Sequence, residues 1–320
     1  MIRIAMIGTF WLTEMFMQAI DEVPDIVLAG VCSRSYEKAK KFIGNRKEIR
    51  IYDDPLKLAA DPDIHAVYIA TPNVTHYELS KLMLNAGKHV LCEKPVCVHL
   101  EEYEELVALA KEKKRVYLEA MINAHLPQMR DIQKTLEISG PVISARLDFS
   151  QRSSKIDRVR QGEVFSTFSR AACGGALMDL GVYSVYMALQ LFGYPKTVDA
   201  YSTPILDVDG SDTVIFGYDG FQVVLTMSKL AESRIRSEII CEHGTITIGL
   251  LSRLQEVDYY PSNGYHKILF GEAEFYESMI WELKDFLSYI RGADYKPMQA
   301  LARDTIKLLT EIRGKIGYEI

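Results

Sequence analysis

Three side chains in this 320-residue sequence have the types and spacing needed to handle a proton at a bound substrate. Lys94 follows an apolar run, and its ammonium can polarise a substrate oxygen and lower the pKa of a neighbouring acid. Asp179 and Tyr183 are four residues apart, so on a helix they share one face. A phenol has a pKa of about 10, which a close lysine lowers, so Tyr183 is a candidate proton donor or acceptor. Asp179 would accept a hydrogen bond; the alternative is a surface lysine, a capping aspartate and a core tyrosine.

The elements that must position Lys94 lie in the first 120 residues. Short apolar runs alternate there with amphipathic segments that begin near Trp11, Ser35, Pro55, Val74 and Leu100. Near-continuous apolar strands separated by helices predict a parallel sheet covered on both faces, with right-handed crossovers. In such a doubly wound (Rossmann) sheet, ligands bind beyond the carboxyl ends of the strands, where Lys94 falls. The predicted strands are residues 2–7, 26–33, 49–52, 65–71, 89–94 and 115–120.

The alternation of predicted strands and helices ends after residue 120. A helix at 126–137, a strand at 142–150 and a helix from about 175 to 191 precede a run of strands that ends near residue 270. Asp219-Gly220, His243-Gly244 and Asn263-Gly264 are typical hairpin turns. We therefore expect a first domain over residues 1–120 and an α+β domain over 121–320 with a large, mostly antiparallel open sheet. The last helices, about 274–291 and 298–314, are expected to pack back near the first domain. The strands expected in the second domain's run are 197–203, 213–218, 221–228, 235–242 and 245–249.

The first strand leads into IAMIGTFWLTEMF, which has the layout of a nucleotide-binding turn. The usual fingerprint has three glycines, and here only Gly8 remains, with Phe10 and Thr13 at the other two positions. A helix N-terminus still attracts phosphate through its N–H groups and its dipole, and the hydroxyls of Thr9 and Thr13 can add donors. On this stretch alone, a phosphate loop and an ordinary apolar helix start are about equally supported.

The end of the second predicted strand bears on the choice of nucleotide. An NAD-binding fold usually has an acidic residue there, but this sequence has Ser33 and Arg34, with Lys38 one turn later. A hydroxyl, a guanidinium and an amine suit a 2′-phosphate. The set therefore favours NADP over NAD, although Arg and Lys are also common at a solvated helix start.

Composition excludes several other classes of protein. The formal net charge of −6 argues against nucleic acid or an anionic membrane as the main partner. We expect no membrane-spanning run and no signal peptide, because Glu14 interrupts the apolar N-terminus. Five cysteines without a Cys-x-x-Cys pair indicate reduced thiols of a cytoplasmic protein, and the seven histidines show no metal-ligand spacing.

Three motifs then resemble one family. ATPNVTHYE at the end of the fourth strand, CEKPV at the end of the fifth and GGALMDLGVY at 174–183 resemble the glucose–fructose oxidoreductase/inositol dehydrogenase (Gfo/Idh/MocA) family. The resemblance implies an N-terminal dinucleotide domain and homodimers or homotetramers formed through the C-terminal sheet. It makes Lys94 the signature catalytic lysine, with a Lys94-Pro95 bond that is often cis, and places the site in an interdomain cleft. It also makes the first loop a phosphate loop. The cofactor contacts that it implies are Gly8, Thr9, Phe10, Trp11, Leu12, Ser33, Arg34, Lys38, Thr71, Pro72, Asn73, His76, Glu93 and Lys94.

Two features bear on the branch of the family. Many members have histidine where Tyr183 stands. With tyrosine at this position, the sequence resembles the glucose–fructose oxidoreductase and dimeric dihydrodiol dehydrogenase branches. The latter tend to carry an aromatic platform after the sixth strand, but EAMINAHLP at 119–127 has Ile122 and Ala124 in place of the Trp and Arg. Asn123 and His125 offer polar contacts that suit a sugar or polyol, although His125 is equally well a core histidine.

The expected function is therefore that of an oxidoreductase. It would transfer hydride between NADP, or NAD, and a carbinol or carbonyl of a sugar, polyol or related small molecule, with Lys94 and Tyr183 handling the proton. The alternative is a non-catalytic NAD(P)-binding sensor that has kept the fold, which the intact Lys94, Asp179 and Tyr183 set disfavours. An enzyme that retains NADP and recycles it between two substrates stays open.

Overall fold

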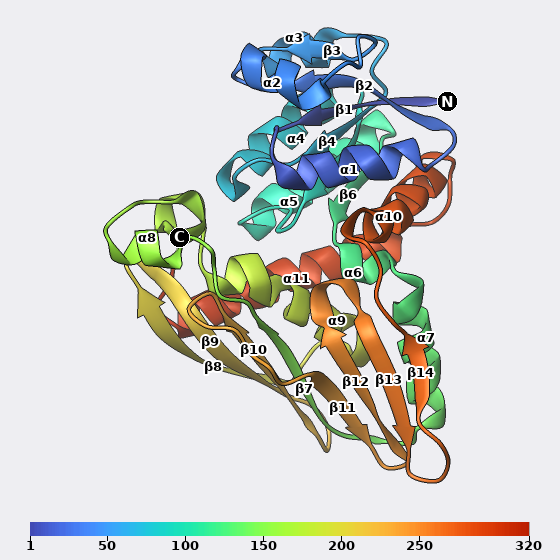
Figure 1. Cartoon of the computed structure of the whole chain (residues 1–320), viewed down its shortest axis with the longest axis vertical. Coiled ribbons are helices and arrows are strands. Elements are labelled where there is room, and N and C mark those ends of the chain that lie inside the picture. Colours follow the sequence, from blue (N-terminus) through green and yellow to red (C-terminus); the bar gives the residue numbers. More distant parts are fainter. Residues whose placement is uncertain (320) are drawn as a thin grey trace. The chain divides into compact units, whose positions relative to one another are not determined.

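The computed structural model describes residues 1–319 and divides into two compact units. The first unit comprises residues 1–121 and 274–300, and the second comprises residues 122–273 and the described residues from 301 onward. The last helix, α11 (Lys296–Lys315), begins in the first unit and ends in the second. Figure 1 shows the chain coloured from the N-terminus to the C-terminus.

A six-stranded parallel sheet forms the centre of the first unit. Its strand order, β3-β2-β1-β4-β5-β6, is that of a doubly wound dinucleotide-binding sheet. Parallel pairing joins every neighbour, so the prediction is confirmed, and each predicted strand lies within two residues of the observed one. The strands are β1 (Ile2–Ile7), β2 (Ile26–Cys32), β3 (Arg50–Tyr52), β4 (Ala66–Ile69), β5 (His89–Glu93) and β6 (Tyr117–Ala120).

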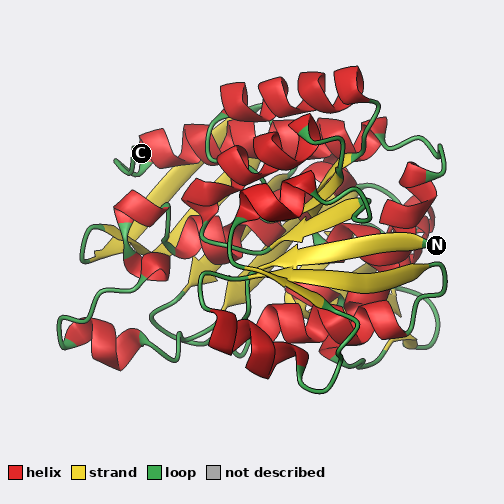
Figure 2. Cartoon of the chain, turned by 90° about the horizontal axis from the view of Figure 1, so that it is seen from above, coloured by secondary structure: helices red, strands yellow, loops and turns green. Residues whose placement is uncertain are grey.

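Helices of the first unit lie on either side of this sheet, as Figure 2 shows around the strands next to the N-terminus. Helix α1 packs against α10, and α4 packs against α5. The helices are α1 (Trp11–Asp21), α2 (Tyr36–Ile43), α3 (Pro55–Ala60), the 3-10 turn η1 (Asn73–Thr75), α4 (His76–Asn85), α5 (Leu100–Lys113) and α10 (Phe275–Ile290).

An eight-stranded sheet forms the second unit, in the order β14-β13-β12-β11-β7-β10-β9-β8 (Figure 1). All pairs are antiparallel except β7 with β10, so the predicted mostly antiparallel sheet is confirmed. Hairpins form at all three predicted turns. Two strands, β13 and β14, were not predicted individually. The strands are β7 (Val142–Ser150), β8 (Thr197–Ile205), β9 (Val208–Gly217), β10 (Gln222–Ser228), β11 (Ser237–Cys241), β12 (Gly244–Leu250), β13 (Gln255–Pro261) and β14 (Lys267–Phe270).

Helix α9 covers one face of the second sheet, where it packs on β7 and β10. Along β7, Ala145 and Leu147 are buried, whereas Ser144 and Arg146 on the opposite face are half-buried. Alternation of this kind is expected of a sheet with a single covered face. The remaining helices are α6 (Ile122–His125), α7 (Pro127–Ile138), α8 (Ile156–Arg160), the 3-10 turns η2 (Ser166–Phe168), η3 (Arg170–Ala172) and η5 (Leu251–Arg253), the π-helical turn η4 (Leu177–Gly181) and α9 (Val182–Phe192).

The segment that ends in α9 corrects two expectations. The single helix predicted at 175–191 is a π-helical turn followed by α9, so Asp179 and Tyr183 lie in different kinds of helical turn. The segment Arg170–Phe192 is also long and apolar enough to cross a membrane, which the sequence analysis did not anticipate. Of the most apolar 18-residue stretch of this segment, 83% is buried inside the structure, as in the core helix of a folded domain.

Candidate active site

Gly8 forms the turn that follows β1. Its φ of +121° is a conformation that L side chains rarely adopt. An added Cβ would lie 2.2 Å from the carbonyl oxygen of Ala70, which follows β4. The amide of Gly8 donates to the Cys32 carbonyl at 3.1 Å. The turn is thus fixed against the ends of both neighbouring strands.

The first turn of α1 is organised by Thr13 rather than by a glycine. The Thr13 hydroxyl accepts a hydrogen bond from the Phe10 amide at 2.9 Å and donates to the Phe10 carbonyl at 2.7 Å. The next amides, of Trp11 and Leu12, begin the helix, and such N–H groups have no intrahelical acceptor. The Phe10 and Trp11 side chains are exposed, and the Trp11 ring packs edge-on against Phe275 of α10. The helix start can therefore present backbone N–H groups to a phosphate.

The end of β2 lies beside this turn. The hydroxyls of Thr9 and Ser33 are 3.3 Å apart, so the two loops are linked by a hydrogen bond. Ser35 caps α2 by accepting from the Lys38 amide. The Arg34 and Lys38 side chains are exposed. Both cations are therefore accessible near the predicted phosphate loop.

The turn after β4 carries the ATPNVTH motif. The hydroxyls of Thr71 and Thr75 are 2.7 Å apart, and Thr75 also donates to the Pro72 carbonyl. Asn73 begins η1 and is half-buried. These residues stand at the carboxyl edge of the parallel sheet, where the sequence analysis expected cofactor contacts.

His76 is completely buried, and its ring nitrogens contact main-chain groups. Its Nε2 lies 2.9 Å from the Thr71 carbonyl oxygen, and its Nδ1 lies 2.9 Å from the Pro95 carbonyl oxygen. Burial lowers the pKa of the imidazole. In this structure His76 ties the turn after β4 to the turn after β5.

Lys94 stands directly after β5, and the Lys94-Pro95 peptide bond is cis, as the family resemblance implied. The Lys94 side chain is half-buried, whereas the residues on both sides of it are buried. The Glu93 carboxylate accepts from Tyr68, and Glu119 Oε1 on β6 accepts from the Val96 amide at 2.9 Å. The turn that carries Lys94 is therefore held by neighbouring strands.

Two buried carboxyl groups lie close enough to Lys94 to interact with its charge. Burial raises the pKa of Glu119 to about 7, and Lys94 opposes that rise. Burial also raises the pKa of Glu93, again against the influence of Lys94. A third buried acid, Glu282 on α10, has a pKa well above its usual value because of burial and then the charge of Glu93. At residues 1–319, no set of three or more His, Cys, Asp or Glu side chains is arranged to hold a metal ion.

In the second unit, Gly174 and Gly175 precede the turn that carries Asp179. Gly175 has a φ of +114°, and an added Cβ would lie 1.9 Å from Asp209 Oδ1. The other carboxylate oxygen of Asp209 accepts from the Leu177 amide at 2.6 Å. The close neighbour of Gly175 is thus a buried aspartate on β9.

Asp179 and Tyr183 are held by different neighbours. Asp179 Oδ2 accepts from Lys229 Nζ at 2.8 Å. The half-buried Tyr183 ring packs edge-on against Phe149 of β7 at 5.5 Å between centroids. The side-chain amide of Asn123 donates to the Tyr183 carbonyl at 3.3 Å.

Asn123 and His125, the tentative substrate contacts, are both buried on the short helix α6. Asn123 is 0% exposed, and its observed contact is with the main chain of Tyr183 rather than with solvent. The geometry thus gives Asn123 a supporting position behind Tyr183.

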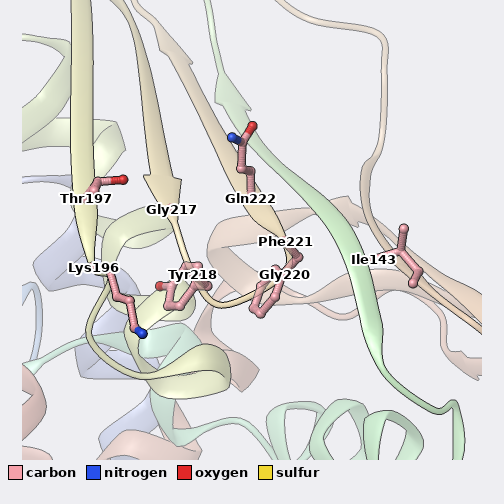
Figure 3. Close-up of a pocket in the computed structure, with 8 residues that line it drawn as sticks. All are labelled: Ile143, Lys196, Thr197, Gly217, Tyr218, Gly220, Phe221 and Gln222. Carbon is pink, nitrogen blue, oxygen red and sulfur yellow. The ribbon is translucent and has the colours of Figure 1, made fainter.

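A hollow in the second unit is lined by other residues. It has a volume of about 640 Å³ and is lined by Ile143, Lys196 and Thr197 together with residues of the β9–β10 turn (Figure 3). The Tyr218 and Phe221 rings stack at 4.8 Å, and Lys196 pairs with Asp219. No predicted site residue lines this hollow.

Comparison with known proteins defines first the class and then the family. Residues 2–121 match the oxidoreductase family with an NAD-binding Rossmann fold, and residues 137–247 match the GFO/IDH/MocA C-terminal domain. The class is thus that of oxidoreductases that use a nicotinamide dinucleotide. The chain belongs to the Gfo/Idh/MocA family, and the family, the fold and the enzyme class expected from the sequence are confirmed.

Two of the following similarities extend over nearly the whole chain, and one covers about three fifths of it. The scyllo-inositol 2-dehydrogenase (NADP(+)) IolU of Bacillus subtilis is 36% identical over 322 residues, which cover 99% of this chain and 98% of that protein. Human trans-1,2-dihydrobenzene-1,2-diol dehydrogenase is 30% identical over 198 residues, 60% of this chain and 57% of that protein. Levoglucosan dehydrogenase, solved with NADH and levoglucosan, superposes with a TM-score of 0.86 at 21% identity, covering 99% of this chain and 97% of that one. At that identity the structural likeness concerns the fold.

Some residues of the site were missed by the sequence analysis. Lys229 contacts Asp179, and Asp209 contacts the helix start, but neither belongs to a recognisable motif. The signal for Lys229 is weak: a single cation stands directly after the apolar strand QVVLTMS. His76 and Glu119 were noticed in motifs, but their support of the Lys94 turn was not.

Proposed function

We propose that the chain is an NADP-dependent dehydrogenase that oxidises a secondary hydroxyl of a cyclic polyol or sugar and reduces the corresponding ketone. The observation that carries the proposal is the position of Lys94, at the carboxyl end of β5 on a turn held by His76 and Glu119. Ligands of doubly wound sheets bind at that edge. The full-length similarity to a scyllo-inositol dehydrogenase supports the substrate class.

The residues at the sheet edge fit a dinucleotide. Gly8 leaves no room for a side chain, and the amides of Trp11 and Leu12 begin α1 next to it, with Phe10 alongside. Ser33, Arg34 and Lys38 are suited to a 2′-phosphate, while Thr9 adds a hydroxyl. The turn of Thr71, Pro72 and Asn73, together with Glu93, completes the proposed cofactor-binding set. When bound, the nicotinamide accepts or returns the hydride.

The protein's own groups handle the proton. In the oxidation, Tyr183 would act as its phenolate and would accept the proton of the substrate hydroxyl. The Lys94 ammonium stabilises the negative charge that develops on the substrate oxygen. Asp179 orients the substrate by accepting a hydrogen bond from a neighbouring hydroxyl. Reduction of the ketone reverses each transfer.

We also propose a homodimer or homotetramer formed through the uncovered face of the eight-stranded sheet, in a reducing compartment such as the cytoplasm. Half-buried residues such as Ser144 and Arg146 face away from α9 and would be available for pairing. The five cysteines are buried free thiols, which suits a reducing compartment. Light scattering coupled to size-exclusion chromatography measures the oligomer size.

The direct test is oxidation of a substrate panel with NADP⁺ and, in parallel, NAD⁺. The panel contains scyllo-inositol, myo-inositol, glucose, levoglucosan and a trans-dihydrodiol, and the absorbance of the reduced nicotinamide reports turnover. We expect turnover of at least one cyclic polyol or sugar, with a higher kcat/KM for NADP⁺ than for NAD⁺. Tight cofactor binding without turnover of any compound would contradict the proposal.

A further inference from the structure

A buried ammonium supports the Asp179 carboxylate. Lys229 directly follows β10, and its Nζ donates to Asp179 Oδ2 at 2.8 Å and to the Thr167 carbonyl oxygen at 2.7 Å. The same Nζ lies 4.4 Å from the centre of the Phe168 ring. The Lys229 side chain is 4% exposed, whereas that of Asp179 is 37% exposed. Lys229 is therefore enclosed by protein, whereas the Asp179 carboxylate is partly exposed.

The main chain fixes Lys229 as firmly as its side-chain contacts do. Its amide donates to the Gly210 carbonyl of β9, and its carbonyl accepts from the Ser153 amide, each at 2.9 Å. The Ser228 hydroxyl accepts from the amides of the two residues that follow Lys229. A lysine stem is flexible in general, but here both the backbone and the ammonium are held.

We propose that Lys229 is a positioning residue for the reaction, which holds the Asp179 carboxylate in the orientation in which it accepts a hydrogen bond from a substrate hydroxyl. This inference rests on the role proposed above for Asp179. A charge-assisted hydrogen bond fixes geometry better than a neutral one. Because Lys229 is buried, it acts through Asp179 rather than by touching the substrate.

The pair is not explained by packing alone. A buried lysine needs a counter-charge, and any nearby acid could supply it. Here the partner is Asp179, the acid of the motif GGALMDLGVY, and the Lys229 ammonium donates to it from the end of β10. A purely structural pair would affect stability, whereas a positioning pair also affects turnover.

A double-mutant cycle distinguishes the two roles. The variants are Lys229→Met, Asp179→Asn and the double variant, assayed for kcat/KM, for NADPH affinity and for thermal stability. We expect Lys229→Met to lower kcat/KM at least about tenfold, the scale of one charge-assisted hydrogen bond. NADPH affinity should be retained. The double variant should have a kcat/KM no lower than that of Asp179→Asn, because both substitutions remove the same Lys229–Asp179 interaction. If the losses of kcat/KM in the two single variants multiply in the double variant, the two residues act independently and the inference is overturned.

Controls keep the test decisive. Lys155→Met removes another ammonium that lies over a phenylalanine ring, that of Phe165, and should leave kcat/KM unchanged. Lys229→Arg keeps the positive charge and should recover part of the activity, and it also serves if Lys229→Met does not fold. A Lys229→Met enzyme with reduced thermal stability but wild-type kcat/KM would overturn the inference.

One readout does not depend on activity. In a crystal structure of Lys229→Met, we expect the Asp179 carboxylate to leave the position it has here, and an unchanged carboxylate would overturn the inference. A wild-type enzyme that turns over no compound of the panel would instead contradict the proposed function. The crystal structure then still decides whether Lys229 positions Asp179.

Discussion

Gly8 is the residue of the proposed nucleotide-binding turn that leaves no room for a side chain. A side chain there would meet the Ala70 carbonyl and would also require an unfavourable φ of +121°. We expect Gly8→Ala to lower the free energy of unfolding by about 3 kcal/mol, because backbone strain and a backbone contact act together. NADPH affinity should fall as well. Denaturant unfolding and cofactor titration measure the two effects.

Gly44 supplies the matched control for this prediction. Its φ is +59°, but an added Cβ would meet nothing within 4 Å. Gly44→Ala should therefore cost less than Gly8→Ala, about 1–2 kcal/mol, because only its backbone conformation (φ +59°, ψ −124°) opposes a side chain. It should leave NADPH affinity unchanged. Equal losses in the two alanine variants would show that the contact with Ala70 is unimportant.

Asp212 makes the stability of the second unit depend on pH. It is 3% exposed beside the equally buried Asp209, and burial followed by that neighbouring charge raises its pKa to about 9. An unfolded aspartate has a pKa of about 3.9. Between these values the folded protein holds a proton that the unfolded chain releases. The contribution of Asp212 to stability is therefore complete below pH 3.9 and declines as pH rises toward 9.

Asp212→Asn removes that proton exchange, so its stability relative to the wild type should rise with pH. The relative free energy of unfolding should increase between pH 5 and pH 8 by at most about 1.4 kcal/mol per pH unit. Urea unfolding of both proteins across this range checks the slope. A constant difference would show that Asp212 is ionised in the folded state.

At the scale of elements, the start of α1 carries the proposed pyrophosphate contact. Trp11 on its first turn is 58% exposed, and the chain's other tryptophan, Trp281 on α10, is 42% exposed. If the dinucleotide lies against α1, NADPH should quench mainly Trp11. We expect Trp281→Phe to keep the quenching and Trp11→Phe to lose it. If NADPH still quenches the fluorescence of Trp11→Phe, the dinucleotide does not lie against the start of α1 as proposed.

The β2–α2 turn carries the proposed choice of nucleotide. Arg34 is exposed next to Ser33, whose hydroxyl contacts Thr9 of the first loop. We expect Arg34→Ala to raise the KM for NADP⁺ about tenfold or more, the scale of a charge-assisted hydrogen bond, with little change for NAD⁺. Lys41→Ala, which removes an exposed cation of α2, is the control. An equal change for both nucleotides would contradict recognition of the 2′-phosphate.

The elements themselves were largely predictable, for a physical reason. Buried parallel strands are continuous apolar runs, so the six strands of the first unit stand out, and three hairpin turns were marked by glycine after Asp, His or Asn. The π-helical turn at Leu177–Gly181 was not predictable, because one extra residue in a helical turn does not visibly change the spacing of apolar residues. Strand β14, at Lys267–Phe270, is short and partly exposed, so its pattern is weak.

The candidate site was predictable only where a motif carried it. Lys94, Asp179 and Tyr183 were identified from short motifs. Lys229 lies 50 residues from Asp179 in the sequence, and their contact depends on how β10 is placed in the sheet. Asp209 likewise reaches Leu177 across 32 residues. Contacts of this kind follow from strand order, which one sequence does not specify.

At the scale of the whole molecule, the proposal requires groups from both units to act in one reaction. Lys94 belongs to the first unit, whereas Asp179 and Tyr183 belong to the second. The proposed cofactor contacts all lie in the first unit. Cofactor binding and proton handling should therefore respond separately to substitutions.

The most direct measurement compares the wild type with Lys94→Met on the best substrate of the panel, recording NADPH affinity and kcat/KM in the same preparations. The account predicts that Lys94→Met loses kcat/KM about a hundredfold or more, the scale of a group that assists proton transfer. The loss of NADPH affinity should be much smaller, because Lys94 is only one of many proposed cofactor contacts. Tyr183→Phe should behave in the same way. A Lys94→Met enzyme that binds cofactor and keeps wild-type kcat/KM would contradict the account.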